Sequence, residues 1–312
     1  MSYRPARTAF LAGSAAAIAA TAWPPPLQAQ TAATPLVAGA GLIEPQAQAY
    51  YARANGFFKA RGLDVTIVTS ANGAATTAAV AGGTLQVGIT SVLGLAQAVG
   101  RGLPFATFAP GGIHDSRFPA SGVLVLPDSK LASAKDLSGK VVAVSTLKGL
   151  DQLVVSALID KLGGDVGSVK FVEMRPTEAL AALQAGRVDA INLEDPEFTA
   201  ARSSTRFLGD AEDAVGKIFV ETTWFATRDW ITKNGDAARR FRDAVIAGGT
   251  WAMANPLPAA LVLQQDLKVT TTRATQRFAS RFNLTDYQLL LDAAAKFKFI
   301  NPTNAADMVV SL

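Results

Sequence analysis

Few side chains in this sequence could carry out nucleophilic or metal-based chemistry. Its 312 residues include one histidine, His114, and no cysteine. A Ser-His-Asp triad would therefore have to use His114, and cysteine nucleophiles, zinc sites and iron–sulfur sites are excluded. His114 follows an apolar run and Gly111-Gly112, which predicts a loop histidine that is either solvated or at the rim of a cleft. Carboxylates are plentiful, but no pair stands out as a general acid and base.

The glycine patterns that hold nucleotides are also missing. No glycine-rich phosphate loop is followed by Lys and then Ser or Thr, and no Gly-x-Gly-x-x-Gly pattern connects a strand to a helix. We therefore expect no cofactor and no ATP site. Without a long run of like charge, nucleic acid is not an expected partner either.

The N-terminal residues predict an export signal. Met1–Arg7 carries two arginines and no acid, Thr8–Ala22 is small and apolar, and three prolines precede Ala29. This order is typical of a cleavable secretory signal, which we predict over residues 1–29. Cleavage after Ala22 is an alternative, as is an uncleaved anchor or a buried first helix. Because the chain has no cysteine to carry a lipid, it is expected to be free in a periplasm.

Composition favours a large folded protein with little net charge. The sequence is 49% hydrophobic and 17% charged, which is enough apolar material for two lobes. Its net charge of +4 falls to +2 when the predicted signal removes Arg4 and Arg7, because 27 basic residues then face 25 acids. The basic character therefore says little about partners.

Strand-length apolar runs alternate with helical segments along the chain after the signal. This alternation is typical of parallel sheets with helices on their faces. The sequence restarts the pattern near residue 122, and 83–89 resembles 186–192 as a helix-to-strand turn. The strands are predicted at 35–40, 63–69, 87–89, 105–109, 122–126, 141–144, 169–172, 188–192 and 219–226. The helices are predicted at 46–54, 75–81, 92–101, 151–162, 176–185, 237–253, 257–267 and 284–297.

Three short motifs follow one another along the chain. The first is Gly56-Phe57-Phe58-Lys59 with Gly62-Leu63-Asp64-Val65, and the second is Asp-Leu-Ser-Gly-Lys-Val-Val-Ala-Val at 136–144. The third runs from Pro176 through Gly186-x-Val188-Asp189-Ala190 to Asp195-Pro196. In this order and spacing they resemble the periplasmic binding proteins of sulfonate, nitrate and thiamine-precursor importers. The resemblance covers residues 36–225 well and the C-terminal helices only by length and type.

This resemblance implies a two-lobed α/β fold of the type II periplasmic-binding-protein class. Each lobe has a mostly parallel sheet flanked by helices, two crossing hinge strands join the lobes, and C-terminal helices brace the first lobe. Lobe 1 is expected at 36–118 plus 224–312, and lobe 2 at 119–223. Two departures are Gln86, where an acid is common, and Ile-Asn-Leu-Glu-Asp-Pro at 191–196, where a tryptophan commonly precedes Glu-Pro. The cysteine and histidine pattern of the pyrimidine-synthesising relatives is absent.

Candidate ligand-binding residues follow from the rule that open α/β sheets bind ligands beyond the carboxyl ends of their strands. In the first lobe they are Ile43, Glu44, Gln46, Asn72, Gly73, Thr90, Ser91 and Gly111. In the second lobe they are Ser145, Thr146, Gly149, Leu150, Arg175, Glu194 and Asp195. The crossing strand adds Thr223 and Trp224. The alternatives are structural: helix caps for Ser91 and Thr146, a turn for Asn72-Gly73, a rim charge for Arg175, a hinge salt bridge for Glu194 and Asp195, and a core position for Trp224.

The ligand class stays open at this point. Hydroxyl groups and helix N-termini favour an oxyanion, whereas Glu194 and Asp195 favour a group that donates hydrogen bonds, such as an amine or a pyrimidine. Sulfonates, nitrate-like anions, aromatic carboxylates and pyrimidines all fit. The resemblance implies a monomeric, non-catalytic substrate-binding component of an ABC importer that closes on a small molecule and docks on an inner-membrane permease. The alternatives are a periplasmic sensor for a membrane receptor and a small-molecule lyase or dehydratase.

Overall fold

The computed structural model describes residues 1–2, 32–268, 270–271 and 273–312. The predicted signal therefore lies almost entirely outside the described residues. The helices and strands all belong to one unit, Ala33–Leu312. Within the described residues, none of the helices combines the length and the apolar character that crossing a membrane requires.

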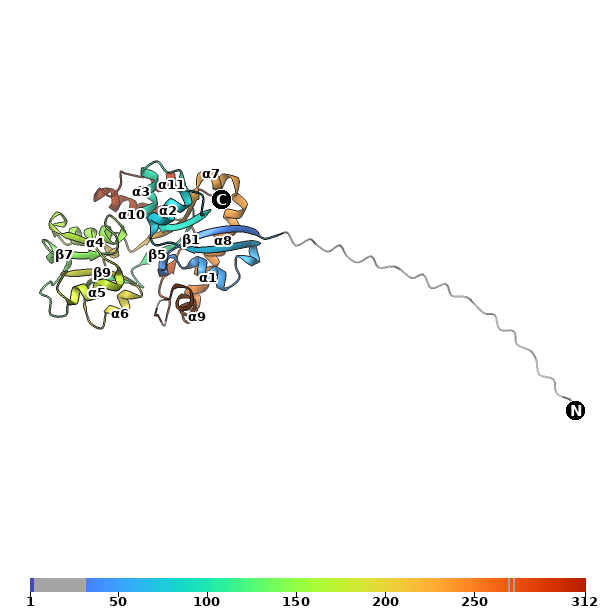
Figure 1. Cartoon of the computed structure of the whole chain (residues 1–312), viewed down its shortest axis with the longest axis horizontal. Helices are drawn as coiled ribbons and strands as arrows, with labels where there is room; N and C mark the ends of the chain where they lie inside the picture. Colours follow the sequence, from blue (N-terminus) through green and yellow to red (C-terminus); the bar gives the residue numbers. More distant parts are fainter. Residues whose placement is uncertain (3–31, 269, 272) are drawn as a thin grey trace. The chain divides into compact units, whose positions relative to one another are not determined.

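The first sheet contains β1 (Thr34–Ala40), β2 (Leu63–Thr69), β3 (Val87–Ser91), β4 (Phe105–Pro110) and β12 (Thr222–Thr227) in the order β2-β1-β3-β12-β4 (Figure 1). β1 runs parallel to β2 and β3, whereas β12 runs antiparallel to both β3 and β4. The central strands are almost entirely buried, as expected for strands covered by helices on both faces.

Helices cover this sheet because they bury apolar and small residues against it. On one side, α1 (Gln48–Ala54) packs on α8 (Gly235–Ala254). A side chain at Gly248 of α8 would come within 2.6 Å of the Gln48 carbonyl, so glycine allows the two helices to approach closely. The other helical segments of this lobe are 44–46 (η1), 59–61 (η2), 73–81 (α2), 92–100 (α3), 228–233 (α7), 256–262 (α9), 263–267 (a π-helix), 284–296 (α10) and 305–308 (α11).

The second sheet contains β6 (Ser121–Val125), β7 (Val141–Val144), β8 (Lys170–Glu173), β9 (Ala190–Glu194) and β10 (Arg206–Gly209) in the order β10-β6-β9-β7-β8. Taken from β8 to β10, the second sheet has the same arrangement as the first sheet taken from β2 to β4. The antiparallel strand β6 occupies the place that β12 has in the first sheet. The predicted α/β class with mostly parallel sheets is confirmed.

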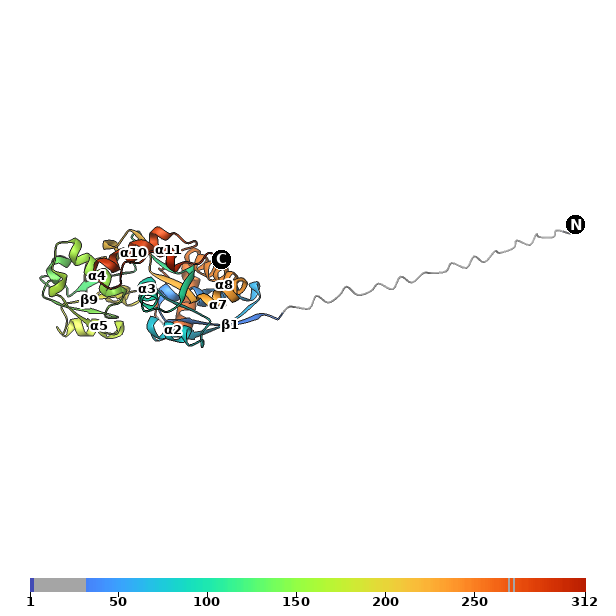
Figure 2. The same ribbon diagram turned by 90° about the horizontal axis from the view of Figure 1, so that it is seen from above.

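The second sheet also has helices on both faces. Neighbouring residues of β7 point to opposite faces, so that Val142 packs with Val154 of one helix layer and Ala143 packs with Leu183 of the other. The helical segments here are 134–137 (η3), 150–161 (α4), 166–168 (η4), 176–184 (α5), 197–201 (α6) and 212–214 (η5). Figure 2 shows α4 and α5 on either side of β9.

A small third sheet carries both chain crossings between the two larger sheets. It is antiparallel and contains β5 (Gly112–Asp115), β11 (Ile218–Val220) and β13 (Arg277–Phe278) in the order β11-β5-β13. β5 leads from the first sheet to the second, and β11 leads back. Two crossing strands were predicted, and they are present. The predicted lobe boundaries, 36–118 with 224–312 and 119–223, stay a prediction.

Several elements differ from the sequence prediction. His114 lies in β5 and is buried, so the prediction of a solvated loop histidine is wrong. The glycines before it suggested a turn, but β5 is paired on both of its edges. The strand predicted at 188–192 lies at Ala190–Glu194, which places Glu194 in the strand. β10, β13, α6, α7 and α11 were not predicted.

Candidate functional site

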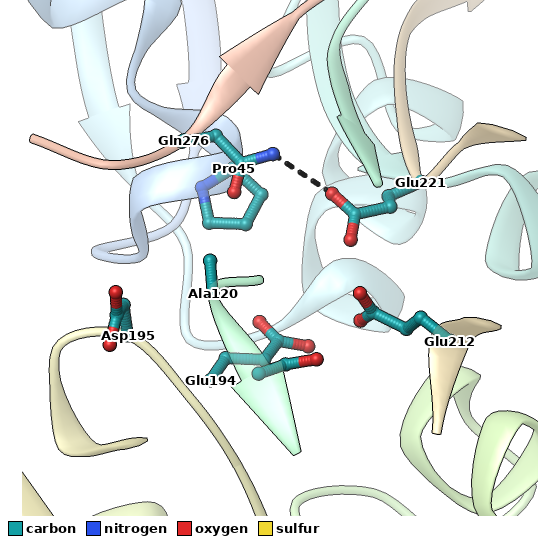
Figure 3. Close-up of a pocket in the computed structure, with 8 residues that line it drawn as sticks. Pro45, Ala120, Glu194, Asp195, Glu212, Glu221 and Gln276 are labelled. Carbon is teal, nitrogen blue, oxygen red and sulfur yellow. Dashed lines mark hydrogen bonds between the residues drawn. The ribbon is translucent and has the colours of Figure 1, made fainter. Parts of the chain in front are cut away.

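A small pocket lies where the two large sheets and the third sheet meet, and carboxyl groups dominate its lining. The lining residues are Pro45, Ala120, Ser121, Glu194, Asp195, Glu212, Glu221 and Gln276 (Figure 3). Its volume is about 10 Å³, which is room for about one water molecule. No lysine or arginine is among the described residues that line it. The pocket therefore has a strongly acidic character.

The strand ends position these acids. Glu194 is the last residue of β9 and pairs with Ser121 of β6. Glu221 lies between β11 and β12, where its N–H donates to the Gly112 carbonyl and its carbonyl accepts from Val92 N–H. Glu212 opens the short helix η5. Figure 3 shows the carboxyl groups of Glu194, Glu212 and Glu221 directed toward one another.

Burial and mutual repulsion keep protons on some of these carboxyl groups. Burial raises the pKa of Glu194 well above its usual range, and the charges of Asp151, Glu212 and Glu221 raise it further. Burial likewise raises the pKa of Glu221, with Glu212 as the next cause. Like charges in a low dielectric cannot all ionise together. The free pocket therefore holds neutral carboxylic acids beside carboxylates.

The chain's one histidine is tied to the acidic pocket. His114 Nδ1 lies 2.8 Å from Glu212 Oε2, and its Nε2 lies 3.0 Å from Asp213 Oδ1. Burial lowers the pKa of His114, but the hydrogen bonds to Glu212 and Asp213 and the charges of Glu212 and Asp210 outweigh burial and raise the pKa to about 9. His114 is therefore an imidazolium whose two N–H groups both donate to carboxylates. His114, Asp210 and Asp213 are close enough to surround a metal ion, but a doubly protonated ring is no metal ligand.

A hydrogen-bonded bridge joins η1 to the end of β9 beside the pocket. Thr275 Oγ1 lies 3.2 Å from Glu44 Oε2 and 2.9 Å from Asp195 Oδ2. Glu44 Oε1 also accepts from the N–H groups of Thr275 and Gln276. One hydroxyl hydrogen cannot serve two carboxylates at once, and burial raises the pKa of Glu44. Thr275 thus links Glu44 of the first lobe to Asp195 at the end of β9 in the second.

Replacing Thr275 with valine tests this bridge. The variant keeps the shape of the side chain and leaves the Glu44 and Asp195 carboxyl groups without their shared hydroxyl, so the free energy of unfolding is expected to fall by about 1–3 kcal/mol. Urea unfolding measures the change. Thr199→Val is the matched control, because Thr199 Oγ1 donates to Asp195 Oδ1 from the neighbouring helix α6 at 2.6 Å. An unfolding free energy unchanged in Thr275→Val, measured where Thr199→Val does lose stability, would contradict the bridge.

Most predicted residues of the first lobe have structural partners. Asn72 caps α2 by accepting from Ala75 N–H, and Ser91 caps α3 by accepting from Gly94 N–H. Gly73 packs against Thr90, where a side chain would come within 2.3 Å of Thr90 Oγ1. Three more of the predicted residues lie around β1 and β4. Gln46 accepts from Gly41 N–H, Ile43 is exposed, and Gly111 packs on Thr222 of β12.

The predicted residues of the second lobe cluster at the start of α4. Ser145 donates through Oγ to the buried Asp151 carboxylate, and Leu150 packs in the core. Gly149 occupies the N-cap of α4, so the alternative role of Thr146 as the cap is wrong, and its side chain is exposed. Arg175 is also exposed and pairs with Glu178.

Thr223 and Trp224 are core residues, which is the structural alternative given for Trp224, and their role as ligand contacts stays a prediction. Trp224 is fully buried, its Nε1 donates to Gln48 Oε1 at 2.8 Å, and its ring packs on Phe241. Thr223 Oγ1 is hydrogen-bonded with Tyr287 and with the Ala109 carbonyl. Both side chains belong to the packing of β12. Only Glu194 and Asp195 of the predicted residues line the pocket, and Glu44 adjoins it.

Four polar residues of the pocket were missed: Ser121, Glu212, Glu221 and Gln276. Glu221 had a usable signal, because it interrupts the apolar run Ile218-Phe219-Val220 just before β12. A buried acid inside such a run is rare unless it has a partner or a function. Glu212 begins the one-turn helix η5 and Gln276 precedes the two-residue strand β13, and elements this short give no signal in the sequence spacing.

Comparison with known proteins identifies the family. Residues 45–259 match the family model described as NMT1/THI5 like. The chain belongs to the NMT1/THI5-like family. The predicted resemblance is therefore confirmed, and the matched segment contains Glu194, Asp195, Glu212 and Glu221.

Relatives of this NMT1/THI5-like protein include two binding proteins. It is 27% identical over 204 residues to the taurine-binding periplasmic protein of Escherichia coli K12, which covers 65% of this chain and 62% of the relative. It is 24% identical over 219 residues to the formylaminopyrimidine-binding protein of Halalkalibacterium halodurans, which covers 69% of this chain and 64% of the relative. The matches thus span less than two thirds of each relative's length.

Solved structures show that the fold of this NMT1/THI5-like protein is that of the two-lobed periplasmic binding proteins. The periplasmic aliphatic sulphonate binding protein SsuA of Escherichia coli aligns with a TM-score of 0.74 at 17% identity, covering 89% of this chain and 93% of that one. The desulfurization enzyme DSZB aligns with a TM-score of 0.65 at 15% identity, covering 89% and 96%. The same fold therefore occurs in binding proteins and in an enzyme.

Proposed function

We propose that this protein is the substrate-binding component of an ABC importer. It captures one small ligand between its two lobes, closes on it, and delivers it to a membrane permease. The observation that carries the proposal is the pocket whose lining comes from both lobes and from the sheet that joins them. A ligand that contacts both lobes favours the closed arrangement over the open one.

Two further features support binding rather than catalysis. The described residues around the pocket offer carboxyl, amide and hydroxyl groups, and the one histidine is held as an imidazolium by two carboxylates. A protonated histidine cannot act as a general base. Taurine and formylaminopyrimidine, named for the two relatives, both carry nitrogen groups that can donate hydrogen bonds. The periplasm is the proposed location, by analogy with the taurine-binding relative.

Thermal unfolding with a panel of ligands tests this proposal. The panel contains a sulfonate, nitrate, an aromatic carboxylate, an aminopyrimidine and a primary amine. A ligand that binds the native state alone is expected to stabilise it by about 2.7 kcal/mol at roughly one hundred times its Kd, which raises the midpoint in a concentration-dependent way.

Mass spectrometry of the incubated ligand separates binding from catalysis. An unchanged ligand together with a raised midpoint supports the binding protein. Conversion of the ligand to a product would instead show that this protein is an enzyme, like the desulfurization enzyme that has the same fold. If no ligand of the panel changes the midpoint, the result counts against a protein that binds small molecules of these classes.

A further inference from the structure

The pocket itself narrows the ligand class, and this step rests on the proposed binding function. Glu194, Asp195, Glu212 and Glu221 line a space of about 10 Å³, and the described lining includes no lysine or arginine to balance them. An anionic group placed here would face four carboxyl groups, and the cation beside them, the His114 imidazolium, is already paired with Glu212 and Asp213. A cationic group would find acceptors on several sides.

One neutral side chain in the same pocket lacks a partner. Ser121 is 3% exposed and lines the pocket, and its Oγ has no hydrogen-bond partner among the described residues. Buried hydroxyl groups in native proteins nearly always have a partner. Ser121 lies beside Glu194 in the lining, because the two residues are paired across β6 and β9. Its hydroxyl is independent of the acids in pointing to a ligand with hydrogen-bonding groups, since it can accept as well as donate.

The size of the pocket indicates which group fits. A primary ammonium group has about the size of a water molecule, carries three N–H donors and has no acceptor. We infer that the pocket binds the primary ammonium group of a small ligand, with Ser121 Oγ, Glu194 and the Glu212–Glu221 pair as its acceptors. The rest of the ligand extends from this pocket between the lobes, so the inferred substrate class is small primary amines, including amino-substituted acids.

Binding of an ammonium group is coupled to proton release. The charged groups that face Glu194 and Glu221 are Asp151 of α4, Glu212 of η5 and His114 of β5. Their repulsion and burial keep protons on Glu194 and Glu221 in the free protein. An ammonium group favours the ionised carboxylates, so it expels about one proton as it binds. Affinity therefore increases as the pH rises, until the amine of the ligand itself loses its proton.

Three probes with one carbon skeleton test the inference: propane-1,3-diamine, 3-aminopropane-1-sulfonate and propane-1,3-disulfonate. Isothermal titration calorimetry of the purified protein gives each Kd. Both amines are expected to bind at least about tenfold more tightly than the disulfonate. Titrations in buffers of different ionisation enthalpy count the protons, and release of about one proton is expected for each amine.

Variants with uncharged side chains in the pocket test whether the amines bind there. Glu194→Gln and Glu221→Gln are expected to weaken amine binding about tenfold or more and to reduce the released proton, because the amide carries no titratable hydrogen. Ser121→Ala removes one acceptor without changing a charge, and a smaller loss of affinity is expected. Glu178→Gln is the matched control, since Glu178 is exposed on α5 and pairs with Arg175.

The thermal midpoint of the free variants adds a readout that does not depend on ligand. Glutamine replaces a buried, protonated carboxyl group with a neutral amide of the same shape, so the midpoints of Glu194→Gln and Glu221→Gln are expected to equal or exceed that of the native protein. Tight binding of the disulfonate, or amine binding unchanged in both variants, overturns the inference and leaves the proposed function standing. Failure of these probes together with the whole earlier panel overturns both.

Discussion

Trp224→Ala is expected to lower the free energy of unfolding by about 3–5 kcal/mol. The indole is fully buried in the middle of the first sheet, where it packs edge-on against Phe241 with ring centroids 5.0 Å apart. Its removal leaves a cavity and also leaves Gln48 Oε1 without the donor it now has at 2.8 Å. Urea unfolding followed by circular dichroism measures the loss.

Trp224→Phe separates a packing role from a ligand contact. Phenylalanine keeps most of the apolar volume, so this variant is expected to recover more than half of the stability that alanine loses. Because the structure places Trp224 in the core, the phenylalanine variant should bind ligand with unchanged affinity. If the phenylalanine variant has nearly native stability but binds ligand much more weakly, Trp224 contacts the ligand.

The stability of the free protein is expected to fall as the pH rises from about 6.5 to about 9. His114 is an imidazolium in the folded state with its pKa raised to about 9. The unfolded histidine titrates near 6.5, so the stabilisation is complete below that pH and is lost as the pH approaches 9. The difference corresponds to about 3 kcal/mol. Its side chain is only 2% exposed, so solvent screens the ion pairs little.

His114→Gln tests the assignment of this pH dependence. Since His114 is the sole histidine of the sequence, the variant should be less stable than the native protein at pH 6 and should approach it near pH 9. Unfolding in urea at several pH values gives both curves. Glu194 and Glu221 act in the same direction. Their pKa values are raised in the folded protein, so the folded state loses stability as the pH rises above the pKa of glutamate in the unfolded chain. Parallel curves for both proteins would contradict the role of His114.

Much of the fold could be predicted because it depends on local patterns. The β-branched run Leu63–Thr69 forms β2 over the predicted residues, and Ser91 caps α3 as its hydroxyl and position suggested. β5 could not be recognised in the same way. Its four residues begin at the second of two glycines and are too few to show an alternation of apolar and polar residues. β5 is a strand because β11 and β13 pair with it from distant parts of the chain.

The site was predicted less completely than the fold. The rule of strand ends found Glu194 and Asp195, since Glu194 ends β9 and Asp195 follows it directly. The same rule gave Asn72 and Ser91, which cap helices, because a cap and a ligand contact require the same residue types at the same place. Glu212 and Gln276 reach the pocket only through tertiary packing, which spacing along the chain does not encode.

The position of β12 has a consequence for how the protein is made. β12 lies between β3 and β4, yet Thr223 of β12 is hydrogen-bonded with Thr107 of β4 across 116 residues. A ribosome therefore completes every strand of the second sheet before it adds β12, an interior strand of the first sheet. Until β12 is synthesised, the edges of β3 and β4 that will pair with it have no partner strand. Unpaired strand edges can form hydrogen bonds with other chains and so promote aggregation. Chaperone dependence of the newly made chain should thus end when residues 222–227 leave the ribosome.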